Sequence, residues 1–122
     1  MGSHPINLAI RFALEVAALF SMGLWGWRSG SGWLRIALAL PVPLIAAALW
    51  GTLAVPGDPS RSGGAPIAVP GVVRLVLELA IFAFATWALH DLGFTRASWM
   101  LGIIVALHYL TSYDRILWLV SQ

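Results

Sequence analysis

Cysteine and lysine are both absent from this chain of 122 residues, and charged residues of any kind are scarce. Without cysteine, the chain cannot form a disulfide, a zinc-thiolate site or a thiol nucleophile. Charged residues make up 10% of the sequence, whereas they make up about a quarter of a typical soluble domain. Hydrophobic residues make up 60%, and the mean hydropathy is +0.87. We therefore expect an integral membrane protein.

Two classes of function are disfavoured by what the sequence does not contain. The seven basic residues are all arginines and are spread along the chain without forming a basic tract, so no nucleic-acid partner is expected. Ser112 lies four residues after His108, but such a pair on one helix usually forms a hydrogen bond and not a catalytic dyad. We therefore expect no enzyme activity and no cofactor.

Four apolar segments are long enough to cross a bilayer, which takes about 20 helical residues at 1.5 Å each. They are predicted at 6–27, 33–53, 69–89 and 97–120. Short turns join the first segment to the second and the third to the fourth, which predicts an all-α membrane domain of two helical hairpins. The proline- and glycine-rich segment 54–68 joins the hairpins and should lie outside the membrane. No signal-peptide pattern precedes the first helix, so we expect that helix to be retained.

The tryptophans give a separate indication of this topology, because tryptophan prefers the membrane-water interface. Five of the seven flank the two short turns: Trp25, Trp27, Trp33, Trp87 and Trp99. Trp50 and Trp118 lie toward the opposite side, as expected for a four-helix bundle with both termini on one side. Four arginines on the side of the termini against three on the other favour termini in the cytoplasm.

Two stretches, RFALEVAALF at 11–20 and RLVLELAIFAF at 74–84, each place an arginine four residues before a glutamate in an apolar run. Arg11 and Glu15 should share one face of the first helix, and Arg74 and Glu78 one face of the third. The recurrence at the start of each hairpin predicts a tandem pseudo-repeat about an axis along the membrane normal.

The fourth segment adds polar groups near the same depth. A charged side chain that faces lipid near the bilayer centre costs about 2.5–3.5 kcal/mol, so we expect these groups to face inward. With His108 neutral, the charges of this polar core balance. Its predicted members are Arg11, Glu15, Arg74, Glu78, His108, Asp114 and Arg115.

Two further patterns concern the shape of the first two helices. Pro41 and Pro43 fall in the middle of the second segment and predict a kink there. Small residues occupy every fourth position of the first helix from Ala9 to Ser21, where a neighbouring backbone could approach closely. This stripe predicts a homo-oligomer unless helices of the same chain cover it.

Four runs of the sequence resemble the YrdB family of small bacterial four-helix membrane proteins of unknown function. They are NLAIRFALEVAALFSMGLWGW, LPVPLIAAALWGTLAVPGDPSRSGGAP, VPGVVRLVLELAIF and HYLTSYDRILWLV. The resemblance spans nearly the whole chain and implies a multi-pass protein of the bacterial inner membrane. It implies no activity, ligand or catalytic residue.

The polar core has two interpretations. It is either a buried ion-pair network that fixes helix order, or a proton or cation site at Glu15, Glu78 and His108. The arginine one turn from each glutamate stabilises the charged carboxylate and so counts against proton transfer. His108 alone is more often a hydrogen-bonded core residue than a relay. A metal site is not expected, because the Glu-x-x-His spacing of a di-iron bundle is missing.

Two functions follow from these interpretations. With a structural core, the protein acts by binding a partner protein or lipid. With a functional core, it is a small proton- or cation-coupled transporter or channel subunit. The segment 54–68 is expected to be a connector, although its length also suits a lid over the polar core or a docking surface.

Overall fold

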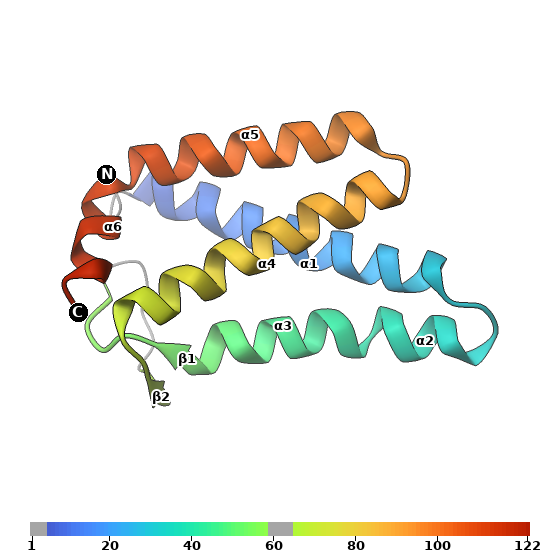
Figure 1. The fold of residues 1–122 in the computed structure, drawn as a ribbon, viewed down its shortest axis with the longest axis horizontal. Coiled ribbons are helices and arrows are strands. Elements are labelled where there is room, and N and C mark those ends of the chain that lie inside the picture. Colours follow the sequence, from blue (N-terminus) through green and yellow to red (C-terminus); the bar gives the residue numbers. More distant parts are fainter. Residues whose placement is uncertain (1–4, 59–64) are drawn as a thin grey trace.

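The computed structural model describes residues 5–58 and 65–122. These residues form an all-α structure with one pair of very short strands. Its elements are α1 (Pro5–Ser29), α2 (Trp33–Ala39), α3 (Pro41–Thr52), β1 (Leu53–Ala54), β2 (Ile67–Ala68), α4 (Gly71–Asp91), α5 (Thr95–Thr111) and α6 (Tyr113–Val120). Figure 1 shows the long helices running back and forth along the molecule, with the start of α1 and the C-terminus at the same end.

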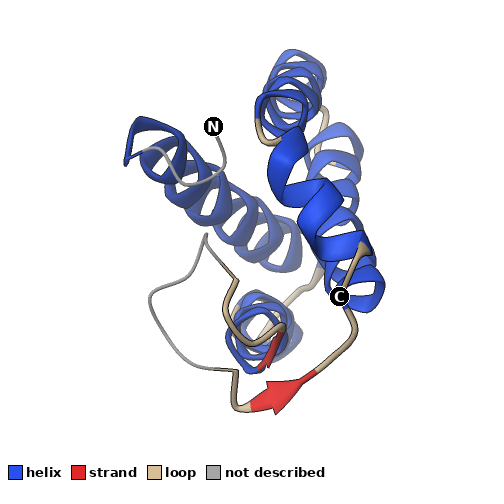
Figure 2. Cartoon of the chain, turned by 90° about the vertical axis from the view of Figure 1, so that its left-hand side faces the viewer, coloured by secondary structure: helices blue, strands red, loops and turns tan. Residues whose placement is uncertain are grey.

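Three helical stretches are long and apolar enough to cross a membrane: α1, the α2–α3 pair over Trp33–Thr52, and α4. A fourth results if α5 and α6 count as one span, but these two helices meet at an angle of 72°. The prediction of one straight helix over 97–120 is therefore corrected. The segment after Ser112 is amphipathic, with Arg115 buried and Leu117 exposed, so α6 lies across the end of the other helices (Figure 2).

The second predicted segment, 33–53, is interrupted at Leu40, between α2 and α3. Pro41 and Pro43 have no N–H group, so neither can donate to the carbonyl four residues earlier. The helix resumes at once, because the N–H of Leu44 donates to the carbonyl of Leu40 at 3.2 Å. The prolines thus interrupt the helix where the sequence predicted a kink.

Two glycines allow helices to approach closely. A Cβ atom added at Gly26 on α1 would lie 2.5 Å from the carbonyl carbon of Leu38 on α2. A Cβ added at Gly71, the first residue of α4, would clash with the backbone of Leu119 on α6. These positions therefore fix how α2 packs on α1 and how α6 packs on the start of α4.

β1 and β2 pair in parallel, with Leu53 opposite Ile67 and Ala54 opposite Ala68. The segment 54–68 is predicted to be a connector, and the strand pair at its two ends is a small correction to that prediction. Two residues per strand are too few for a sheet with a side-chain pattern, so backbone hydrogen bonding alone forms it. The pair holds the two ends of the connecting loop together beside the start of α4 (Figures 1 and 2).

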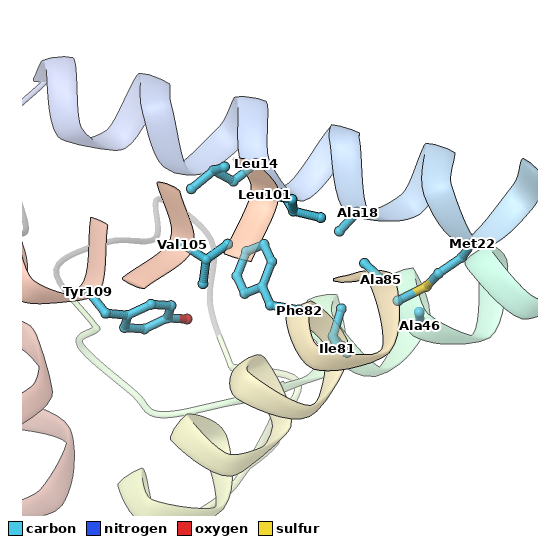
Figure 3. Packing of buried hydrophobic residues seen from close by; sticks show 10 residues of the cluster. All are labelled: Leu14, Ala18, Met22, Ala46, Ile81, Phe82, Ala85, Leu101, Val105 and Tyr109. Carbon is cyan, nitrogen blue, oxygen red and sulfur yellow. The ribbon is translucent and has the colours of Figure 1, made fainter. Parts of the chain in front are cut away.

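A core of buried apolar side chains lies where α1, α3, α4 and α5 meet (Figure 3). Phe82 packs edge-on against Trp50 and Tyr109, with ring centroids 5.3 and 6.2 Å apart. The core comprises Leu14, Ala18, Met22, Ala46, Ile81, Phe82, Ala85, Leu101, Val105 and Tyr109.

Polarity is inverted relative to a soluble protein. Phe12, Phe20 and Trp99 are 67%, 71% and 66% exposed, whereas Arg74 and Glu78 are fully buried. In soluble proteins, charged side chains are rarely fully buried, and contiguous apolar patches on the surface are small. The described residues thus combine an apolar surface, compatible with a membrane protein, with buried charged side chains.

Candidate functional site

Glu78 of α4 is fully buried, and both of its carboxylate oxygens accept hydrogen bonds. Arg115 of α6 donates to Oε1 at 2.8 Å and to Oε2 at 2.7 Å. Arg74, one turn earlier on α4, donates from Nε to Oε2 at 2.7 Å. Arg11 of α1 forms an ion pair from Nη2 to Oε2 at 2.8 Å, and the hydroxyl of Tyr109 on α5 donates to Oε1 at 2.7 Å. One carboxylate thus connects four helices.

Asp58, from the loop after β1, is the second anion of this cluster. Its oxygens accept hydrogen bonds from Nε of Arg115 at 3.1 Å and from Nη2 at 2.7 Å. A two-pronged contact of this kind is the strongest geometry for an arginine and a carboxylate. Only 5% of Asp58 is exposed. Asp58 therefore joins the start of the loop to α6 and to the buried ion pairs.

Arg74 also anchors the end of α3. Its Nη1 donates to the carbonyl oxygens of Trp50 and Leu53, at 2.5 and 2.7 Å. Carbonyl groups at a helix C-terminus have no partner within the helix and carry a partial negative charge, which a cation stabilises. The ring of Trp50 lies 5.4 Å from the guanidinium of Arg74 and 5.7 Å from that of Arg11. Arg74 thus joins α3 to α4 through the same group that pairs with Glu78.

The charges of the cluster balance, but with a different acid from the one that the sequence suggested. Arg115 faces inward on α6, and its neighbour Asp114 is turned outward and exposed, because adjacent residues on a helix lie about 100° apart. The expected inward position of Asp114 is therefore corrected. Three arginines meet three carboxylates: Arg11, Arg74 and Arg115 with Glu15, Glu78 and Asp58.

Sequence reasoning missed Asp58, because it lies in a segment that was expected to be an external connector. No spacing rule links it to Arg115, which is 57 residues away. One indirect signal was available. The chain has five acidic residues, and once Asp114 faces outward and Asp91 lies at the opposite hairpin, charge balance leaves Asp58 as the remaining candidate.

Glu15 occupies the edge of the cluster. Its Oε1 lies 3.3 Å from Nε of Arg11, and 25% of its side chain is exposed. It lines a cavity of about 170 Å³ between α1 and α3, which is also bordered by Leu19 and Trp50. Glu15 and Glu78 thus have different environments although the sequence gave them the same pattern.

His108 is buried on α5, beside Tyr109, with the two ring centroids 5.6 Å apart. Within the described parts of the chain, neither of its ring nitrogens has a hydrogen-bond partner. The expectation of a hydrogen-bonded core histidine is therefore not met there. Close to it in sequence, Thr111 and Ser112 bond instead to Asn7 of α1, at 3.1 and 3.0 Å.

The carboxylate of Glu78 is surrounded by donors of the protein itself. Both oxygens of Glu78 are occupied by arginine and tyrosine donors, so no site remains on them for a metal or substrate. Among residues 5–58 and 65–122, no three His, Asp or Glu side chains are grouped to hold a metal ion. The cluster comprises Arg11, Glu15, Asp58, Arg74, Glu78, Tyr109 and Arg115, and we refer to it as the ion-pair cluster.

Comparison with known proteins places the chain among uncharacterised relatives. Residues 9–106 match the family described as "Protein of unknown function (DUF2568)". The chain is 46% identical over 119 residues to "Uncharacterized protein YrdB" of Bacillus subtilis (strain 168), an alignment that covers 98% of this chain and 97% of that protein. No solved structure matches. The matched span includes Arg11, Glu15, Arg74 and Glu78. This protein therefore belongs to the DUF2568 family.

Proposed function

We propose that this protein is a non-catalytic, multi-pass protein of the bacterial inner membrane that acts by binding a partner protein or lipid. The observation that carries the proposal is the inverted polarity of the fold. Glu78 and Arg74 are fully buried, while large apolar side chains cover the outside. The resemblance to uncharacterised relatives is compatible with this role and adds no activity to it.

Four spans in two hairpins fit the helix lengths. α5 has 17 residues, or about 26 Å at 1.5 Å per residue, which is close to the roughly 30 Å of the hydrocarbon core. α6 then lies along the interface with its apolar face toward the lipid, in the manner of an amphipathic helix. With four spans, both termini lie on one side of the membrane.

The orientation depends on which arginines are counted. Cytoplasmic termini are favoured by a count of Arg11, Arg61, Arg74 and Arg115. Of these, Arg11, Arg74 and Arg115 are buried in the ion-pair cluster, away from the loops, and Arg61 lies outside the described residues. The exposed arginines of the described residues are all at the hairpin end: Arg28, Arg35 and Arg96. By the positive-inside rule, we propose that the hairpin turns lie in the cytoplasm and both termini outside.

Single cysteines test this orientation cleanly, because the chain has no cysteine of its own. Ser121→Cys, near the C-terminus, should react with an impermeant maleimide in intact cells. Ser31→Cys, in the first hairpin turn, should react only after the cells are permeabilised. The reverse labelling pattern would return the termini to the cytoplasm, and labelling of both sites in intact cells would contradict a fixed orientation.

A partner helix has one obvious place to pack. Ala9, Ala13 and Ala17 are exposed on α1, so no helix described in this chain covers the small-residue stripe, although Ser21 at its end is buried. Small residues allow close backbone approach between membrane helices. Cross-linking from Ala13→Cys in native membranes should give a dimer or a specific adduct. A monomer alone would remove α1 as the contact surface.

One observation supports a transporter as the second candidate function. Glu15 is partly exposed to the small cavity between α1 and α3, so a proton or a cation could reach it without breaking the bonds of Glu78. Proteoliposomes separate the two functions. Our proposal predicts no proton or cation flux above that of empty liposomes, whereas flux that is abolished by Glu15→Gln would establish the transporter.

A further inference from the structure

A groove of about 820 Å³ lies between α4 and α5, near the turn that joins them. Its floor includes the buried side chains of Phe82 and Val105, and exposed Trp87 and Trp99 stand at its sides. Ligand pockets usually measure about 300–1,000 Å³, so the groove is large enough for a small molecule or a lipid chain. It shares no side chain with the ion-pair cluster.

Small residues create the groove. Ala83 and Ala106 line its two helices, and Gly102 lies on α5 opposite Thr86. A Cβ atom added at Gly102 would lie 3.6 Å from Cγ2 of Thr86, so a side chain could be built there in ordinary contact. The space exists because these positions carry no larger side chain.

The interior of the groove is apolar in effect. The hydroxyl of Thr86 donates to the carbonyl of Phe82, and that of Ser98 donates to the carbonyl of Thr86, each at 2.8 Å. Neither hydroxyl proton is therefore left for a ligand. Such a surface suits a hydrocarbon chain.

The end of the groove beside the hairpin is different, because the polar side chain of His90 is part of its lining. Arg96 is not a lining residue, but it lies on α5 three residues before the lining residue Trp99, which is helical spacing for neighbours on one face. Arg28 lies 5.1 Å from the ring of Phe94 in the hairpin turn. This end of the molecule has three exposed arginines, Arg28, Arg35 and Arg96, and one acidic residue among those described, Asp91. The Oδ2 atom of Asp91 accepts a hydrogen bond from Trp25.

We propose that the groove between α4 and α5 binds one anionic phospholipid, with an acyl chain along Ala83 and Gly102 and the phosphate beside Arg96 and His90. The inference rests on the proposed membrane location and names the lipid among the proposed partners. Lining and charge agree: a hydrocarbon chain fills an apolar groove, and basic pockets between membrane helices bind anionic head groups. Indole N–H groups of tryptophan at the interface can donate to the head group.

Native mass spectrometry of the full chain, released from nanodiscs of phosphatidylcholine with a minor fraction of acyl-matched phosphatidylglycerol, tests the proposal. The protein should retain one phosphatidylglycerol in preference to phosphatidylcholine. Arg96→Gln should lower that preference about fivefold while lipid remains bound, since each arginine near an anionic surface contributes about this factor.

Two exposed alanines one turn apart on α4 provide a matched pair. Ala83→Leu adds a side chain inside the groove and should lower retention of phosphatidylglycerol about tenfold, as overfilling a packed space does. Ala80→Leu adds the same side chain on α4 outside the groove lining and should leave retention unchanged. Gly102→Leu repeats the test from α5, so the result does not depend on the folding of one variant.

Equal retention of the two lipids by the unmodified protein would overturn the proposal, as would a preference that both Ala83→Leu and Gly102→Leu leave intact. Either result would leave the groove filled by bulk lipid. Neither would remove the proposed function, because binding of a partner protein, or of a lipid elsewhere on the surface, would still satisfy it. Conversely, failure of the chain to fractionate with membranes would remove the proposed function before any lipid is compared.

Discussion

The two Arg-x-x-x-Glu stretches have the same sequence pattern, but their glutamates lie in different environments. Glu78 is fully buried and is contacted by Arg11, Arg74, Arg115 and Tyr109. Glu15 is a quarter exposed, and within residues 5–58 and 65–122 its ion-pair partner is Arg11 alone. The helical spacing is identical in the two stretches, so the difference comes from the neighbouring elements. α6 and the loop bring Arg115 and Asp58 to the end near Glu78, and no other described element brings an arginine to Glu15.

Removal of the central carboxylate should have the largest effect. Glu78→Gln keeps the shape of the side chain but leaves three buried arginines with too little negative charge. Breaking a buried ion pair from one side costs about 3–5 kcal/mol, so the free energy of unfolding in detergent micelles should fall by that amount. Denaturant titration followed by circular dichroism measures it, and a loss below about 1 kcal/mol, the usual value of an exposed pair, would contradict the buried network.

The contact between the loop and α6 should come next. Asp58→Asn removes the negative charge with which the loop pairs Arg115. A hydrogen bond to a charged group contributes about 1.5–3 kcal/mol to stability. Val55 is buried in the same loop, so Val55→Cys reports whether the loop stays closed. Maleimide labelling at position 55 should accelerate when Asp58→Asn is added. Labelling at exposed Pro56→Cys is the control and should not change.

Tyr109→Phe isolates one neutral donor of the cluster. The hydroxyl of Tyr109 donates to Oε1 of Glu78 at 2.7 Å, and loss of one hydrogen bond to a charged group lowers stability by about 1.5 kcal/mol. The apolar contact between the ring and Phe82 remains. The thermal midpoint of unfolding should fall less than in Glu78→Gln. An equal fall would mean that the hydroxyl of Tyr109 contributes as much to stability as the charge of Glu78, and would contradict the central role of the carboxylate.

Glu15→Gln should have the smallest effect of the four. The carboxylate of Glu15 is partly exposed and its distance to Nε of Arg11 is 3.3 Å, so the loss should stay below about 1 kcal/mol, as for a surface pair. The same denaturant titration applies. A loss as large as that of Glu78→Gln would show that the two stretches are equivalent after all.

Much of the fold could be predicted from the sequence, because the helices depend on local pattern. Apolar length predicted the membrane-length helices, and the two prolines predicted the interruption of the second. Burial of Arg11, Arg74, Glu78 and Arg115 followed from the cost of charge in lipid.

What the sequence could not provide depends on tertiary packing. The bend at Ser112 arises because α6 turns to place Arg115 against Glu78 and Asp58. The burial of Asp58 depends on the path of a loop, and the difference between Glu15 and Glu78 depends on which helices approach each. Periodicity within a single helix contains no information on any of these contacts.

A double-mutant cycle between Glu78 and Arg115 tests the central claim most directly, with the cycle between Glu15 and Arg11 measured in parallel. The claim is that Glu78 is the shared partner of the buried arginines. Glu78→Gln with Arg115→Gln removes both charges, so the double variant should be more stable than the sum of the single losses predicts, by about 2–3 kcal/mol. The parallel cycle should give less than about 1 kcal/mol. Additive losses at Glu78 and Arg115, within about 0.5 kcal/mol, would mean that the two side chains do not interact and would contradict the account.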